Sequence, residues 1–199
     1  ENIRAVASGK DAVSLSMPDT AYHAFNGLEA FAGKPAKDLR GLMATYPIDI
    51  QFFVPADSPV KTIGELKGKK VAVGAPGSGT EAMARYVLKV YGLTYDEVDE
   101  QFLSATETAE ALKDGNIDAG IVTLGTPAPA LMDLATQRDI RFLDIEPAVG
   151  DKINKEFPAY FPRTIPAGTY KGQDQPHHTL AWMGLFVIDA KTSDQLAYD

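Results

Sequence analysis

Residues 70–92 decide the fold class, and they read KVAVGAPGSGTEAMARYVLKVYG. The apolar start predicts a parallel strand that is buried on both faces. A glycine-rich turn follows, and then a helix whose apolar side chains recur every three or four residues until Gly92 provides a stop. Strand, turn and helix in this order form the repeating unit of an α/β protein.

The same alternation continues along the chain. Capping boxes, in which a hydroxyl residue is followed three residues later by glutamate, predict helix starts at Thr62, Thr94 and Ser104. Apolar and alternating runs predict strands at 12–17, 39–46, 50–54, 119–124, 141–145 and 179–188, and helices at 18–26, 79–91 and 127–137. Prolines at 158, 162, 166 and 176 predict irregular chain after Pro147. We therefore expect mostly parallel sheets with helices on both faces.

Two extended segments, near Ile50 and near Leu180, have a second possible meaning. They are interpreted as strands that cross between two lobes, although the periodicity equally allows one continuous sheet. The chain opens without a methionine and ends at a helix-start signal, Thr192-Ser193-Asp194. We therefore expect it to be the central part of a longer protein.

Composition excludes several function classes. The 199 residues carry 27 acidic and 19 basic side chains, a formal net charge of −8, which argues against binding to nucleic acid or to an anionic membrane surface. The absence of cysteine excludes disulfides, zinc–thiolate sites and thiol nucleophiles. No apolar run of membrane-spanning length occurs.

The glycine-rich turn is a candidate anion site, because a helix start exposes unpaired N–H groups. A triphosphate loop is disfavoured, since Thr80 stands where the required lysine would be. The dinucleotide pattern is met by Gly77–Ala82, but no acid ends the next strand to bind a ribose hydroxyl. A carboxylate held by backbone N–H groups and the Ser78 and Thr80 hydroxyls is the third interpretation, and a plain turn stays open.

Three further segments have the position or the composition of a binding loop. Asp19–His23 and Thr123–Pro127 lie where a strand gives way to a helix, the usual ligand edge of an open sheet. Gly168–Gly172 places glycines on both sides of Tyr170 and predicts a loop that reaches over a cleft. Simpler roles stay open for all three, such as a helix cap at Asp19 or a plain turn. No nucleophile and base are paired by any catalytic motif.

Several motifs, in order, resemble the TAXI family of TRAP-transporter solute receptors over nearly the whole chain. They are 19–27 (DTAYHAFNG), 67–79 (KGKKVAVGAPGSG), 114–119 (DGNIDA), 125–127 (GTP) and 165–172 (IPAGTYKG). Two positions depart from the family pattern. Thr20 stands where a bulkier residue such as tryptophan is frequent, and Thr126 where histidine is common, which would change the size or polarity of the ligand.

The resemblance implies a type II periplasmic-binding fold with one lobe formed by residues 1–53 plus 180–199 and the other by residues 54–179. It also implies a precursor with a signal peptide, export to the periplasm and delivery of the ligand to TRAP membrane subunits. The ligands implied are glutamate, glutamine or 2-oxoglutarate.

We therefore expect a monomeric binding protein for a small carboxylate, with no catalysis, metal or cofactor. The alternative is a nucleotide-dependent enzyme that uses the Gly77–Ala82 loop. The expected ligand-binding residues are Asp19, Thr20, Tyr22, His23, Gly77, Ser78, Gly79, Thr80, Gly125, Thr126, Pro127 and Tyr170.

Overall fold

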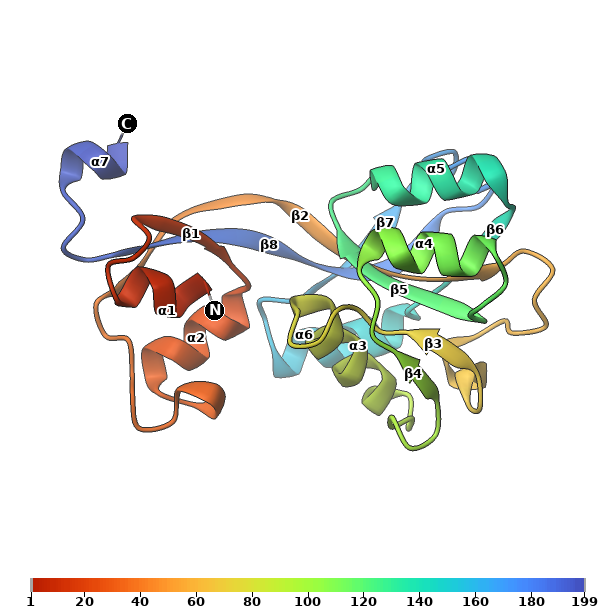
Figure 1. The fold of residues 1–199 in the computed structure, drawn as a ribbon, viewed down its shortest axis with the longest axis horizontal. Coiled ribbons are helices and arrows are strands. Elements are labelled where there is room, and N and C mark those ends of the chain that lie inside the picture. Colours follow the sequence, from red (N-terminus) through yellow and green to blue (C-terminus); the bar gives the residue numbers. More distant parts are fainter. Residues whose placement is uncertain (1, 199) are drawn as a thin grey trace. The chain divides into compact units, whose positions relative to one another are not determined.

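A computed structural model describes residues 2–198 and divides the chain into two compact units (Figure 1). Unit 1 contains the chain up to Pro47 and from Trp182 onward, and unit 2 contains Ile48–Ala181. The chain passes from one unit to the other inside two long strands, β2 (Leu39–Pro55) and β8 (His177–Asp189). The boundaries of the two expected lobes, after residue 53 and before residue 180, remain a prediction.

Unit 1 is a small sheet with short helices. Besides parts of β2 and β8, it holds α1 (Asn2–Ala7), β1 (Val13–Ser16), α2 (Pro18–Asn26), the 3-10 turn η1 (Glu29–Phe31) and α7 (Asp194–Tyr198). Strand β1 pairs antiparallel with β8, with Val13 opposite Ile188. Helix α2 ends, as predicted, at Gly27, whose φ of 67° is the left-handed conformation of a helix stop. The small core includes Ile3, Val6, Ala24, Leu39 and Val187.

Unit 2 carries most of the regular structure. Its strands, besides parts of β2 and β8, are β3 (Lys70–Ala72), β4 (Asp99–Gln101), β5 (Ala119–Leu124), β6 (Ile140–Leu143) and β7 (Phe161–Ile165). Its helices are η2 (Ile63–Leu66), α3 (Gly79–Val90), α4 (Ala105–Lys113), α5 (Pro129–Gln137) and α6 (Pro147–Glu156). One part of its core forms where α4 and α5 pack on the sheet, through residues that include Phe53, Leu112, Val122, Leu131 and Leu134.

The sheet of unit 2 is mixed. Its strands lie in the order β8–β2–β5–β3–β4, while β6 also pairs with β2 and β7 with β8. Strand β3 is parallel to both β4 and β5, and the α3 and α4 helices supply the return connections. The pairs β2–β5, β2–β6 and β7–β8 are antiparallel. The α/β class with flanking helices is confirmed, and the sheet combines parallel pairs among β3, β4 and β5 with antiparallel pairs.

Three elements differ from the prediction, each because of a proline. Strand β2 runs unbroken through Pro47, where no pairing with β5 is needed because that pairing begins at Asp49. Pro147 does not break the chain but occupies the first turn of α6, where a missing N–H costs nothing. Pro162 lies in β7, which pairs on one side only, with β8.

Two helix starts also differ. The capping boxes at Thr62 and Ser104 form as expected, whereas Thr94 begins a turn that does not continue as a helix. Helix α5 starts at Pro129 instead of Pro127. No helix within residues 2–198 is both long enough and apolar enough to cross a bilayer.

Gly120 is the position in β5 that tolerates no side chain. A β-carbon there would lie 2.5 Å from Cζ of Phe53 and 2.6 Å from Cγ2 of Thr108. We predict that Gly120→Ala lowers the free energy of unfolding by about 1–3 kcal/mol through overpacking, measured by urea denaturation. Gly64→Ala is the control, because a β-carbon at Gly64 meets nothing within 4 Å. Equal stability of the two variants would contradict this packing.

Candidate functional site

The glycine-rich turn and the end of β5 lie at the same edge of the sheet. Strand β3 is parallel to β5, with Ala72 opposite Gly120, so the carboxyl ends of both strands point the same way. Open α/β sheets bind ligands at this edge. The turn requires glycine at position 74, where φ is +97° and a β-carbon would lie 2.7 Å from Cβ of Thr80.

Two hydroxyl groups join the turn to β5. Oγ1 of Thr80, in the first turn of α3, lies 2.5 Å from Oγ1 of Thr123, near the end of β5. Ser78 is the N-cap of α3, and its Oγ accepts a hydrogen bond from the N–H of Glu81 at 3.2 Å. The hydroxyls of Ser78, Thr80 and Thr123 each keep capacity for a further hydrogen-bond partner.

A pocket of about 220 Å³ opens beside these hydroxyls. The residues that line it come from the ends of β3, β4 and β5 and from the starts of α3 and α4: Gly74, Ala75, Ser78, Thr80, Leu103, Ser104, Ala105, Ile121 and Val122. It is smaller than the pockets of about 300–1,000 Å³ that enclose whole drug-sized ligands. It therefore suits the head group of a ligand or a small anion.

Two helix starts meet at this pocket. Ser104 caps α4 in the same way that Ser78 caps α3, and its Oγ accepts from the N–H of Glu107 at 3.4 Å. The N–H groups of Gly79 and Ala105, the first residues of the two helices, have no partner within the described part of the chain. Two positive helix ends and several neutral donors thus surround one small space.

No charged residue lines the pocket. The acid in the first turn of α3, Glu81, is 7% exposed and is held by Arg85 and by the hydroxyl of Tyr95. The acid in the first turn of α4, Glu107, is exposed, and its pKa is lowered by hydrogen bonds from Ser104. Because no lysine or arginine is present, an anion here would depend on backbone donors, hydroxyls and helix dipoles.

The Asp19–His23 segment lies in unit 1, in the first half of α2. Oδ1 of Asp19 accepts from the N–H of Thr20 at 2.6 Å, and the N-cap is Met17. Tyr22 is 62% exposed, and its ring meets that of His23 edge-on with 6.0 Å between centroids. A solvent-exposed tyrosine beside a partly buried histidine is available for contact with a ligand.

The two remaining predicted segments meet in the interior of unit 2. Tyr170 is only 3% exposed; its hydroxyl accepts from the N–H of Ala128 at 2.9 Å and donates to Oε1 of Gln51 at 2.8 Å. Oγ1 of Thr126 is buried as well, and the Thr126–Pro127 peptide bond is cis. The Gly168–Gly172 segment therefore places the Tyr170 side chain in the interior, where it bonds to the 125–128 loop.

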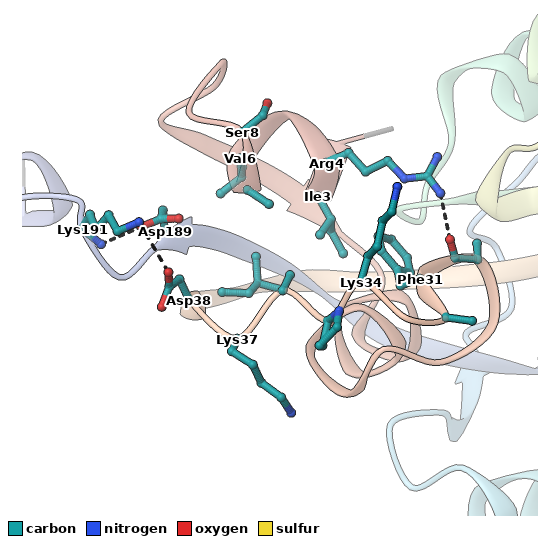
Figure 2. Close-up of a pocket in the computed structure, with 16 residues that line it drawn as sticks. Ile3, Arg4, Val6, Ser8, Phe31, Lys34, Lys37, Asp38, Asp189 and Lys191 are labelled. Atoms are coloured by element: carbon teal, nitrogen blue, oxygen red, sulfur yellow. Dashed lines mark hydrogen bonds and ion pairs between the residues drawn. The ribbon is translucent and has the colours of Figure 1, made fainter.

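Unit 1 contains a separate cavity of about 680 Å³ (Figure 2). It is lined by α1, the 30–39 segment, Asp189 and Lys191, and by none of the predicted ligand-binding residues. The guanidinium of Arg4 donates to the carbonyl of Ala30 at 2.8 Å, and Lys191 pairs with Asp38 at 3.5 Å. Nζ of Lys37 lies 4.3 Å from the ring centroid of Phe25. Of the four cationic side chains that line the cavity, Arg4, Lys37 and Lys191 therefore have interaction partners within the unit.

Sequence reasoning did not select Ser104 or Ala105 as site residues, and it named the Thr123–Pro127 segment without placing Thr123 among the expected ligand-binding residues. Ser104 was recognised as a helix cap, and it follows β4 just as Ser78 follows β3. Since parallel strands carry their carboxyl ends to one edge, that shared order was the available signal. The contact of Thr123 with Thr80 depends on which strands are neighbours, and the local pattern does not contain that information.

Solved structures share the fold at low sequence identity. The periplasmic aliphatic sulphonate binding protein of Escherichia coli matches 90% of this chain and 47% of its own length at 18% identity, with a TM-score of 0.50. An ancestral arginine-binding protein matches 98% and 65% at 17% identity with a TM-score of 0.52. XAC2383 of Xanthomonas citri, solved with chloride and with ATP, matches 98% and 63% at 12% identity with a TM-score of 0.57. These likenesses show a periplasmic-binding-protein-like α/β fold.

Sequence comparison extends this result. A curated protein of Escherichia coli (strain K12), named for binding aliphatic sulfonates, is 33% identical over 66 residues, which is 33% of this chain. The chain spans 20% of that relative and about half of the sulphonate-binding structure. The model of the NMT1-like family matches residues 1–199, all of the sequence. The chain therefore belongs to the NMT1-like family.

Proposed function

We propose that this chain is the ligand-binding part of an extracytoplasmic solute-binding protein of the TAXI type. It captures a small carboxylate in the periplasm and delivers it, as a monomer and without catalysis, to the membrane subunits of a TRAP transporter. One observation carries the proposal: two capped helix starts and the Thr80 hydroxyl, which is bonded to Thr123, line a small uncharged pocket at the ligand edge of an α/β sheet.

The carboxylate head is placed in this pocket, which involves Gly77–Thr80 directly. The free N–H groups at the starts of α3 and α4 donate to its oxygens, and each helix dipole adds about 0.3–1 kcal/mol, more when partly buried. The Thr80 and Thr123 hydroxyls are bonded to each other, which uses one of their two protons, and the other O–H can donate a hydrogen bond that contributes about 1 kcal/mol. Neutral N–H and O–H donors of this kind can bind any small oxyanion, so a sulfonate is the competing head group.

The ligand class follows from the sequence motifs. Glutamate, glutamine and 2-oxoglutarate are the compounds implied by the TAXI resemblance, and each carries at least one carboxylate. Asp19, Thr20, Tyr22 and His23 stay proposed ligand contacts within unit 1, since the Tyr22 ring is exposed and carries a hydroxyl. The curated relative's name favours sulfonates, which makes the comparison of carboxylates with sulfonates the deciding one.

A nucleotide-dependent enzyme is less well supported. The Thr80 side chain occupies the place of the phosphate-binding lysine and is bonded to Thr123. The pocket is small, and none of its lining residues is cationic. ATP was bound by XAC2383, but at 12% identity that likeness concerns the fold alone.

Ligand screening by thermal shift separates these classes. We expect the melting temperature to rise with L-glutamate, L-glutamine or 2-oxoglutarate, because a ligand that binds the folded state stabilises it by mass action. The panel also contains alkanesulfonates, L-arginine, NAD, ATP and GTP. Stabilisation by alkanesulfonates alone would reject the carboxylate, and stabilisation by nucleotides alone would reject the receptor.

Thr80→Val tests the pocket itself. The substitution keeps the shape and removes one hydroxyl, so we predict about a fivefold increase in the Kd of L-glutamate or 2-oxoglutarate, measured by calorimetry. Thr94→Val is the matched control, because Thr94 is exposed and does not line the pocket. An unchanged Kd in a folded Thr80→Val protein would mean that the carboxylate binds elsewhere.

A further inference from the structure

The Gly168–Gly172 segment was expected to touch the ligand, but its tyrosine is directed into the interior. Tyr170 packs against Phe142, with ring centroids 5.1 Å apart and planes inclined by 30°. Its backbone N–H is bonded to Oε1 of Gln173 at 3.3 Å, which fixes the loop behind the ring. With 3% of its surface exposed, Tyr170 has little area to offer a ligand.

The Tyr170 hydroxyl instead connects β2 to the start of α5. It donates to Gln51 on β2 and accepts from the N–H of Ala128, the N-cap residue of α5. Ala128 is fully buried, so this N–H would otherwise be left without a partner in the interior. Gln51 lies opposite Val122 in the β2–β5 register, which places both ends of the connection beside β5.

A second buried contact acts on the same loop. The Asp49 carboxylate is fully buried, lies opposite Leu124 in register and has Nη1 of Arg163 at 3.3 Å. Burial raises the pKa of this carboxyl, and the Thr126 hydroxyl and Arg163 oppose that rise. Oγ1 of Thr126, in the same loop as Ala128, is itself buried.

The 125–128 loop held in this way follows β5, whose residues Ile121 and Val122 line the pocket. Thr123 bonds to Thr80 in the proposed anion site, and five residues later Ala128 bonds to Tyr170. The geometry points to Tyr170 as a positioning residue: it fixes the 125–128 loop that follows β5, so that Thr123 at the end of this strand keeps its hydroxyl on Thr80, which lines the pocket. Tyr170 sets affinity through this loop and does not touch the ligand. This role deepens the proposed function and rests on it.

The first test requires no ligand. In spectra of protein labelled at threonine methyl groups, Tyr170→Phe should shift or broaden the Thr80 and Thr123 signals and leave those of Thr94 and Thr136 unchanged. Tyr86→Phe is the control, because it removes one tyrosine hydroxyl that donates to Glu156 at an exposed position outside this network. Unchanged Thr80 and Thr123 signals in Tyr170→Phe would overturn the positioning role, whatever the protein binds.

The second test is a double-mutant cycle on the Kd of L-glutamate and 2-oxoglutarate. Tyr170→Phe and Thr123→Val should each weaken binding about fivefold. The double variant should also be only about fivefold weaker, because Tyr170→Phe displaces the same Thr123 hydroxyl that Thr123→Val removes. A multiplicative loss of about 25-fold would indicate that Tyr170 acts independently, and would overturn the inference. Wild-type affinity in Thr123→Val and Thr80→Val would reject the pocket instead, while the methyl spectra still decide the role of Tyr170.

Discussion

The parallel pairing of β3 with β5 is the constraint on which the site depends. It brings the carboxyl ends of two strands to one edge, so that Thr80, after the glycine-rich turn, meets Thr123 near the end of β5. It also brings the starts of α3 and α4 to that edge, because each helix follows a strand of the parallel set. Without this pairing, the starts of α3 and α4 and the hydroxyls of Thr80 and Thr123 would not lie at one edge of the sheet.

This arrangement offers favourable interactions to an anion although the protein is acidic and no cation lines the pocket. Helix ends and backbone N–H groups carry partial positive charge that needs no lysine or arginine. Glycine at position 74 allows the close approach of the turn to Thr80, and Gly120 allows Phe53 and Thr108 to pack against β5. Because the walls are uncharged, oriented dipoles and hydrogen bonds would supply the attraction for an anion in this pocket.

Local signals predicted most of the fold and part of the site. These signals predicted the start of α3 at Gly79, the cap at Ser104, the stop at Gly27 and the limits of β5, because each is determined by a few neighbouring residues. Proline was the main source of error, since Pro47, Pro147 and Pro162 occupy positions that need no N–H. The Thr80–Thr123 contact and the burial of Tyr170 depend on strand register and packing between distant segments, which a local pattern does not encode.

Backbone NMR during titration with L-glutamate and with 2-oxoglutarate tests the central claim most directly. The account predicts that the largest amide shift changes occur at Gly79, Thr80 and Ala105, whose N–H groups lie at the two helix starts. It also predicts little change at Arg4 and Lys34, which line the cavity of unit 1 (Figure 2). Saturable changes confined to that cavity, with the helix-start amides unmoved, would contradict an anion site at the β3–β5 edge.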